Sequence, residues 1–420
     1  MESLNYPKFA ETLKKLINKI ICTLLILVSY LQLKAQNPWY RVDDPESKTC
    51  YFIDTFGKQL PIGVHDKLKI NEIFSGGLIC INFKKKAEKK DAWGCLNEKG
   101  DTIISGKYLE PFYFYNGVAK VSVEPIPLKV SVDGDEPAFY CKYINTRGEL
   151  IIDKLFEGDN SYDMDHSWTV TKFGIQWYIL SKNGKLKELS VDYAYVTAFS
   201  NGLAKCKRMN HYTVYIDTTG WPAAEIRNEN YTGDFFNGFA EYSTVKGKFG
   251  FINKSGQPVS PCIYDEVSYF SENLAAVKMY GKWGFIDEKG KIVIKPEYDA
   301  TDAFYEGLAC VCSNGKCGFI NKLGKLVIPL KFNTTHSFFP NGLAAVSQEN
   351  NKWGFINKKG DWVIKPHFIQ GEKFDQYGFS TVFYTDKNSY KKGKIETYEK
   401  ALISKHGRVV WCSGEKLILK

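Results

Sequence analysis

Short apolar runs alternate with turns along most of the chain. In the most regular stretch the runs are Leu274–Val277, Gly284–Ile286 and Ile292–Ile294, and turns containing Gly281 and Gly290 separate them. Apolar runs of this length between turn residues are typical of strands. Proline follows the third run in several copies, where a missing backbone donor ends ladder pairing. The pattern therefore predicts an antiparallel meander of three strands that is copied along the chain.

A glycine closes the second turn of each copy and gives the period of the repeat. Successive closing glycines are 34 to 48 residues apart, and those in the middle of the chain are 34 to 36 apart. An Asp, Asn or Ser stands three residues before each of them, as a type I turn favours. The longest intervals contain insertions at 84–91, 124–137 and 385–400, which we expect to be loops. The closing glycines are Gly57, Gly100, Gly148, Gly184, Gly220, Gly256, Gly290, Gly324, Gly360 and Gly407.

An aromatic residue followed by glycine opens the strand before many of these turns. Lys282–Asp287 reads Lys-Trp-Gly-Phe-Ile-Asp, and Lys352–Asn357 nearly repeats it. Together with the preceding Leu-Ala-x-Val run and the following Val-Ile-x-Pro run, this resembles the WG-repeat family of bacterial proteins. The match is clearest over residues 235–370. The positions that carry it are Trp93, Gly94, Phe249, Gly250, Trp283, Gly284, Gly290, Gly318, Gly324, Trp353, Gly354 and Gly360.

The resemblance implies a domain of WG-type β repeats over residues 36–420, with a binding or scaffold role and no shared catalytic activity. We therefore expect an all-β fold, a tandem array of about ten three-stranded antiparallel meanders. Stacked meanders can close into a propeller-like ring or continue as an open superhelix. If the array closes, Cys50 and Cys412 come close together, whereas in an open array they stand at opposite ends.

The N-terminus has the features of a secretory signal. Lys14, Lys15 and Lys19 precede an apolar run from Ile20 to Leu31. That run is shorter than the roughly 20 residues that a membrane-spanning helix needs. We interpret residues 1–35 as a signal peptide cleaved after Ala35, and an uncleaved anchor is the alternative. The expected location is outside the cytoplasm, in the periplasm, at the cell surface or outside the cell, with no membrane span after the signal is removed.

The charge of the chain is mildly basic. Its formal net charge is +9, and removal of residues 1–35, which contain five Lys and two Glu, leaves +6. Much of the excess lies in two isolated runs, 84–90 and 391–394, which are typical of solvated loops. Nucleic-acid binding needs a continuous basic stripe. We therefore expect no nucleic-acid partner, and a protein or surface glycan as the ligand.

Recognised catalytic and cofactor motifs are missing from the sequence. There is no H-E-x-x-H metal motif, no phosphate-binding glycine loop and no G-x-S-x-G nucleophile elbow. Acidic loops at Asp133–Glu136 and Asp163–Asp165 could bind Ca²⁺, but neither completes an EF-hand loop. We expect no enzyme activity and no cofactor. The alternative is a secreted glycan-acting hydrolase with loop carboxylates on one face; Tyr384, Tyr390 and Tyr398 are possible sugar-stacking residues.

Cysteine offers one specific prediction. Asn314-Gly315 is a strong signal for a two-residue hairpin loop, which would place Cys312 opposite Cys317. Residues directly opposed on antiparallel strands lie within the separation that a disulfide tolerates. We predict a Cys312–Cys317 disulfide in an oxidising compartment, and two free thiols are the alternative. Cys310 with this pair forms only a weak metal-binding pattern, and Cys95, at a repeat Phe position, is expected to be a small buried apolar residue.

Overall fold

The computed structural model describes residues 40–44, 49–54, 58 and 70–412, apart from short internal stretches. These stretches are 76, 84–90, 98, 116, 126–138, 158–167, 210–211, 228–230, 339–341, 349–350, 376–377, 386–389, 392–393 and 396–398. The signal peptide expected at residues 1–35 lies outside the described residues, as do both acidic loops. All regular secondary structure in the described part of the chain is β strand.

The strands follow one another in sequence as antiparallel meanders. The first half contains β1 (Tyr40–Asp44), β2 (Thr49–Ile53), β3 (Ile70–Ser75), β4 (Leu78–Asn82), β5 (Trp93–Asn97), β6 (Thr102–Tyr108), β7 (Val118–Pro125), β8 (Phe139–Asn145), β9 (Leu150–Glu157), β10 (Trp168–Phe173), β11 (Gln176–Ser181), β12 (Leu186–Glu188), β13 (Tyr193–Ser200), β14 (Leu203–Arg208), β15 (Thr213–Asp217) and β16 (Pro222–Ile226). The second half contains β17 (Tyr231–Thr232), β18 (Phe239–Val245), β19 (Lys248–Asn253), β20 (Pro258–Tyr264), β21 (Glu266–Val267), β22 (Leu274–Met279), β23 (Lys282–Asp287), β24 (Ile292–Tyr298), β25 (Ala300–Thr301), β26 (Leu308–Ser313), β27 (Lys316–Asn321), β28 (Leu326–Phe332), β29 (Thr334–Thr335), β30 (Leu343–Ser347), β31 (Trp353–Asn357), β32 (Trp362–Phe368), β33 (Gln370–Gly371), β34 (Phe379–Tyr384), β35 (Tyr390–Lys391), β36 (Lys394–Ile395), β37 (Glu399–Ser404) and β38 (Val409–Cys412).

Most units have four strands, one more than the three-stranded meander that the sequence predicts. The extra strand opens the unit; from β17 onward it is two residues long, as in β21, where Glu266 pairs with Lys278 of β22, whereas β3 and β13 are longer. It comes from the connecting segment, and two residues carry no apolar period from which a strand could be predicted. Two three-stranded units, β7–β9 and β10–β12, join edge to edge into one six-stranded sheet.

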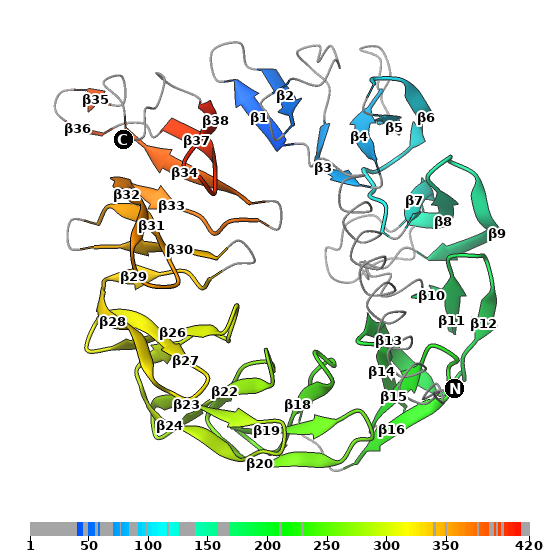
Figure 1. Cartoon of the computed structure of the whole chain (residues 1–420). Coiled ribbons are helices and arrows are strands. Elements are labelled where there is room, and N and C mark those ends of the chain that lie inside the picture. Colours follow the sequence, from blue (N-terminus) through cyan, green and yellow to red (C-terminus); the bar gives the residue numbers. More distant parts are fainter. Residues whose placement is uncertain are drawn as a thin grey trace, which may run out of the picture.

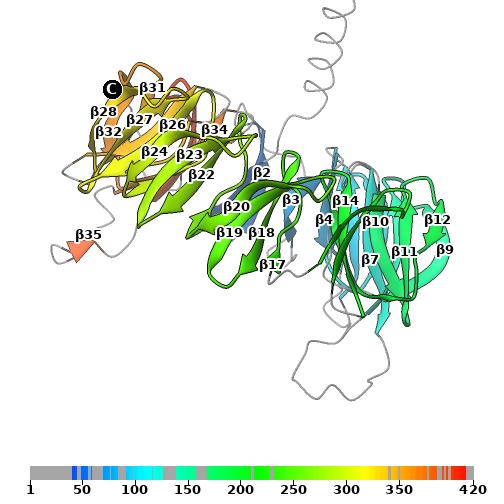
Figure 2. The same ribbon diagram turned by 90° about the horizontal axis from the view of Figure 1, so that it is seen from below.

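The units are arranged side by side around a ring (Figure 1). The fourth strands, such as β24, β28 and β32, lie on the outside, and the second strands lie nearer the middle. The two ends of the array meet, because Ile53 of β2 packs against Leu402 of β37 and Trp411 of β38. Figure 2 shows the same neighbours from another side, with β2 next to the unit that contains β34. The array is therefore a propeller-like ring. The sequence predicts that Cys50 and Cys412 come close together in a closed array, but the side chain of Cys50 lies outside the described part of the chain.

The glycine of the Trp-Gly pair is required by the close approach of the fourth strand. A Cβ on Gly284 would lie 2.5 Å from the carbonyl oxygen of Ile294, and one on Gly318 would lie 2.4 Å from that of Ile328. The pairing register shifts at this point, between Trp283 and Phe285, as in a β-bulge. The repeat therefore places glycine where the bulged backbone leaves no room for a side chain. The same holds at Gly94, Gly250 and Gly354.

The closing glycine has two separate functions. At Gly290 the backbone φ is 76°, in the left-handed region that favours glycine. The turn is the type expected from the sequence, since Oδ1 of Asp287 accepts hydrogen bonds from the backbone N–H groups of Lys289 and Lys291. A Cβ on Gly290 would also lie 2.3 Å from the carbonyl oxygen of Val259, in the preceding unit. The period of the sequence is thus the period of contacts between units.

A regular pair of phenylalanines joins each unit to the next in the second half of the ring. Phe285 of β23 packs against Phe304, which lies in the loop before β26, with ring centroids 4.8 Å apart. Both rings are completely buried. Such aromatic pairs contribute about 0.5–1.5 kcal/mol beyond their area burial. The equivalent pairs are Phe251–Phe270, Phe319–Phe338 and Phe355–Phe374, at 4.8–4.9 Å.

Candidate binding surfaces

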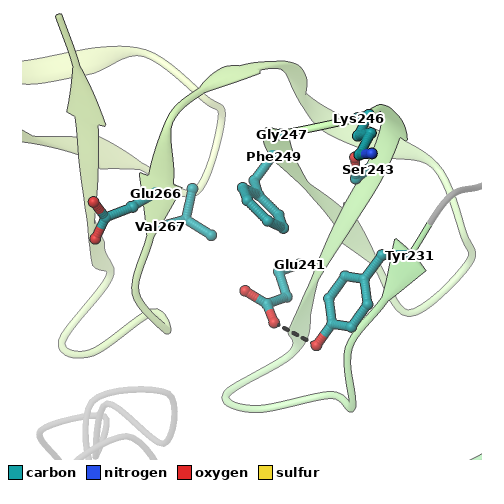
Figure 3. Close-up of a pocket in the computed structure, with 8 residues that line it drawn as sticks. All are labelled: Tyr231, Glu241, Ser243, Lys246, Gly247, Phe249, Glu266 and Val267. Atoms are coloured by element: carbon teal, nitrogen blue, oxygen red, sulfur yellow. Dashed lines mark hydrogen bonds between the residues drawn. The ribbon is translucent and has the colours of Figure 1, made fainter. Parts of the chain in front are cut away.

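A cleft of about 520 Å³ opens between the β17–β20 unit and the β21–β24 unit (Figure 3). We call it the inter-unit cleft. Tyr231 of β17 and Glu266 of β21 come from the first strands of the two units, and Phe249 of β19 lies between them. The lining is completed by Glu241, Ser243, Lys246, Gly247 and Val267.

The inter-unit cleft lies where the sequence departs from the repeat. Phe249 stands at the Trp position, which Trp283 occupies in the next unit, and its ring is smaller. Glu241 stands where the next unit has Ala276, so a carboxylate points into a place that is normally apolar and small. The sequence alone does not indicate either residue as a binding residue, because their difference from the repeat becomes informative only when the two neighbouring units are compared in the structure.

The polar groups of the inter-unit cleft are partly organised. The hydroxyl of Tyr231 donates a hydrogen bond to Oε1 of Glu241 at 2.7 Å. The Tyr231 and Phe249 rings are nearly perpendicular, with centroids 6.2 Å apart. On the other wall, Oε1 of Glu266 pairs with Nζ of Lys278 at 2.5 Å. The cleft can therefore offer aromatic surface and carboxylate oxygen to one ligand.

The Tyr231 phenol makes stability depend on pH in the alkaline range. Burial, and then the hydrogen bond to Glu241, raises the pKa of Tyr231 to about 12. A raised pKa favours the neutral phenol in the folded state, so its stabilisation is complete below the ordinary tyrosine pKa of about 10 and is lost as the pH rises through about 12. We expect urea midpoints measured by fluorescence to fall over this range, and Tyr231→Phe to reduce the fall. Tyr280→Phe, at a 92% exposed position, is the control that leaves the fall unchanged.

A second surface consists of exposed aromatic rings on three successive units. Phe236 and Tyr269 are 49% and 41% exposed, with ring centroids 4.9 Å apart. The hydroxyl of Tyr269 is hydrogen-bonded to that of Tyr305 in the next unit. Each of these residues lies in the loop between the first and second strands of its unit. We call this row the aromatic track.

Polar contacts between units fix the loops that carry the aromatic track. Nζ of Lys322 pairs with Glu272 of the preceding unit at 3.0 Å, and Nζ of Lys358 pairs with Glu306 at 2.6 Å. The hydroxyl of Ser271 donates to the carbonyl oxygen of Phe304 at 2.6 Å. Exposed ion pairs contribute only about 0–1 kcal/mol each. Their role is therefore to set the position of neighbouring loops more than to stabilise the ring.

Cys312 and Cys317 form a disulfide in the structure, with Cα atoms 4.0 Å apart. Cys310 lies beside them, and its sulfur contacts the Thr335 hydroxyl at 2.6 Å. Burial raises the pKa of the Cys310 thiol to about 12, so this thiol stays protonated at neutral pH. All three sulfur atoms lie within 4.8 Å of one another. Two of these sulfur atoms are joined in the disulfide, so in this state only the Cys310 thiol is available to bind a metal ion.

The disulfide closes a short hairpin loop, so its expected contribution is modest. The chain-entropy relation gives about 2 kcal/mol for a loop of this length. We expect the double variant Cys312→Ser and Cys317→Ser to lose about that much free energy of unfolding under oxidising conditions, and to match the wild type when both are reduced. Urea titrations of both proteins with and without a dithiol reductant measure this. Equal free energies of unfolding for the oxidised wild type and the oxidised double variant would contradict a stabilising role for this bond.

Of the three tyrosines proposed to stack on sugars, the structure describes the side chain of Tyr384. Tyr384 is 3% exposed and packs in the core near Phe374 and Phe355, so its assignment as an exposed ring was wrong. It belongs to β34, whose alternate side chains point into the unit. The side chains of Tyr390 and Tyr398 lie outside the described part of the chain.

Comparison with protein families identifies the repeat. The model of the WG containing repeat matches residues 93–124, 249–283, 283–317, 318–353 and 353–384. The chain carries WG repeats. The matched segments include the Trp-Gly positions at Trp93, Trp283 and Trp353; of the residues that line the inter-unit cleft, they include Phe249, Glu266 and Val267. No curated protein matches the sequence.

Several solved structures are similar to the WG-repeat ring in fold. One described as the crystal structure of the eukaryotic initiation factor is 13% identical, has a TM-score of 0.50, and covers 90% of this chain and 96% of its own. BamB from Moraxella catarrhalis is 13% identical over 69% of this chain and 98% of its own, at a TM-score of 0.29. Kluyveromyces lactis Hsv2 is 9% identical over 57% and 90%, at 0.32. The described residues include no helix able to cross a bilayer.

Proposed function

We propose that this chain is an exported, non-catalytic binding module whose WG repeats present a surface to a protein or glycan partner. The observation that carries the proposal is that one pair of units has both surfaces. The inter-unit cleft and two residues of the aromatic track, Phe236 and Tyr269, belong to the β17–β20 and β21–β24 units. Exposed aromatic rings and clefts with a few polar groups are both typical of recognition sites.

Export is supported by the basic and apolar segment at the N-terminus. A signal peptide at residues 1–35 would deliver the ring to the periplasm, the cell surface or the medium. Fractionation of cells that make the full chain, followed by N-terminal sequencing of the exported form, tests this. A cytoplasmic product that keeps residue 1 would contradict export.

Binding is tested by capture from the cell envelope. The wild-type ring is immobilised beside the variant Phe236→Ala/Tyr269→Ala and a control, Ile175→Ala, which removes an exposed apolar side chain from the turn between β10 and β11, in another sheet. A glycan array is probed with the same three proteins. We expect a partner that the wild type and the control retain and the aromatic variant loses. Equal capture by all three would show that the aromatic track is not the binding surface.

A secreted glycan-acting hydrolase is the second candidate, because two glutamates, Glu241 and Glu266, line one cleft, although the Glu266 carboxylate points away from Glu241 and pairs with Lys278 (Figure 3). Glycosidases use such pairs of carboxylates. Release of reducing sugar from envelope polysaccharides by the wild type, and its loss in both Glu241→Gln and Glu266→Gln, would establish this activity in place of simple binding. We expect no release.

A further inference from the structure

We propose that the inter-unit cleft binds the positively charged side chain of a lysine or arginine in an extended protein segment. This proposal deepens the binding function above and rests on it. It depends on a comparison between two adjacent units of the ring, one of which already holds a lysine in the equivalent place.

The β21–β24 unit shows how the fold accommodates a lysine. Nζ of Lys278 lies 5.6 Å from the centroid of the Trp283 ring and pairs with Glu266 at 2.5 Å. Lys278 pairs across the sheet with Trp283 on one side and with Glu266 on the other. An ammonium group over an aromatic ring next to a carboxylate is a favourable cation–π and ion-pair arrangement.

In the β17–β20 unit the aromatic ring is kept and the lysine is replaced. Ser243 stands at the position of Lys278, Phe249 stands at that of Trp283, and Tyr231 stands at that of Glu266. The short serine side chain cannot cover the ring, and the inter-unit cleft lies at this place. The cleft therefore lies at the place that the ammonium group of Lys278 occupies in the next unit, beside an aromatic ring in both cases.

The inter-unit cleft contains two carboxylates, Glu241 and Glu266, and one lysine, Lys246, which is exposed. Because Glu266 is paired with Lys278, Glu241 is the group that favours a bound cation. Glu241 is half-buried, and its oxygen accepts a hydrogen bond from the neutral Tyr231 hydroxyl. In the part of the chain that the structure describes, Glu241 forms no ion pair with a lysine or arginine. A partly desolvated carboxylate gains more from a bound cation than an exposed one does.

A protein segment supplies such a cation together with apolar neighbours. The aromatic track begins on the same two units, where Phe236 and Tyr269 are exposed and in contact. A lysine or arginine in the cleft would bring flanking apolar residues of an extended segment toward these rings. A glycan would use the rings without needing the negative charge of Glu241.

Binding of short labelled peptides tests the inference. One peptide has a central lysine flanked by leucines; in its partner norleucine, which has the same shape without the charge, replaces the lysine. We expect the lysine peptide to bind the wild type at least tenfold more tightly than the norleucine peptide, and Glu241→Gln to remove this preference. Glu288→Gln, in an exposed turn, is the matched control that keeps it. Equal affinity of both peptides for the wild type would overturn the proposal.

A second variant restores the arrangement of the neighbouring unit. Ser243→Lys places a lysine where Lys278 lies and is expected to block the lysine peptide without lowering the urea midpoint; if it lowers the midpoint, Glu241→Gln alone decides. If the envelope partner still binds through the aromatic track while the lysine peptide does not, the proposed function stands and the cation site fails. Competition by a glycan from the array for the same cleft would also reject it.

We also infer, from an independent observation, that Cys80 and Cys95 form a second cross-strand disulfide when the chain is oxidised. The two residues face each other on β4 and β5, and both are buried, at 3% and 1% exposure. In the β25–β28 unit the equivalent positions are Cys310 and Phe319. These lie two residues along each strand from the bonded pair Cys312 and Cys317. Positions two residues apart lie on the same face of the sheet and have the same type of cross-strand pairing. Cys80 and Cys95 are both free thiols in this structure, and their cross-strand pairing places the two side chains opposite each other.

The reaction transfers two electrons and two protons from the two thiols to an oxidant of the disulfide class, which is reduced to a dithiol while the new S–S bond forms. Peptide mapping of protein from an oxidising compartment tests it, after free thiols are alkylated without reduction. We expect a Cys80–Cys95 linked peptide beside the Cys312–Cys317 one. Alkylated Cys80 and Cys95 in a sample whose Cys312–Cys317 bond is intact would refute the inference, because that bond shows the sample to be oxidised.

Discussion

Replacement of Phe285 by alanine is expected to lower the free energy of unfolding by about 3–5 kcal/mol. The ring is completely buried and packs against Phe304 of the next unit at a centroid distance of 4.8 Å. Its removal leaves a cavity at the boundary between two units. To fill this cavity, one sheet would have to move toward the other. Stability is therefore lost at an interface as well as within one unit.

Urea unfolding followed by tryptophan fluorescence measures this loss. Leu323→Ala is the matched control, because that side chain is 85% exposed and the change is expected to cost less than about 0.5 kcal/mol. If Phe285→Ala moved the midpoint no further than the control does, the aromatic pairs would not hold neighbouring units together.

A change of Gly290 to alanine is expected to destabilise the ring more than the same change at Gly281. Both glycines have positive φ, 76° and 79°, so both variants bear the left-handed strain of about 1–2 kcal/mol. A Cβ at Gly281 meets no atom within 4 Å, whereas one at Gly290 would lie 2.3 Å from a backbone oxygen of the preceding unit. Overpacking of this kind costs about 1–3 kcal/mol more.

The difference between the two variants is therefore a measure of how closely units approach. It is obtained from paired urea titrations at one pH, with the wild type beside them. Equal destabilisation by Gly290→Ala and Gly281→Ala would show that the closing glycine serves its own turn alone, and that the unit boundary tolerates an added methyl group.

Local turn chemistry made the repeat predictable from the sequence. Asp287 and Gly290 fix a turn through hydrogen bonds within five residues, so their spacing alone predicts the hairpin. The all-β class and the tandem meanders were confirmed for the same reason. The sequence shows three clear strands per unit, and whether the connector adds a fourth could not be read from it, because an opening strand such as β21 is two residues long and has no period of its own.

Long-range packing accounts for what the sequence did not predict. Closure of the ring depends on Ile53 meeting Leu402, and no feature of either segment alone indicates this contact. The inter-unit cleft depends on Glu241 and Ser243 differing from the residues at the same place in the next unit. From the sequence alone, such a deviation cannot be told from the ordinary variation between repeats; the structure shows that these two residues line a cleft.

The contact that joins β2 to β37 and β38 is made by side chains, since β1 and β2 form a sheet of their own. The last sheet, β33–β34–β37–β38, likewise takes all its strands from one end of the chain. Among the described strands, no sheet is shared between the beginning and the end of the polypeptide. A circularly permuted gene that starts at another connector should therefore still encode the same closed shape, which makes this architecture a suitable host for new termini and inserted domains.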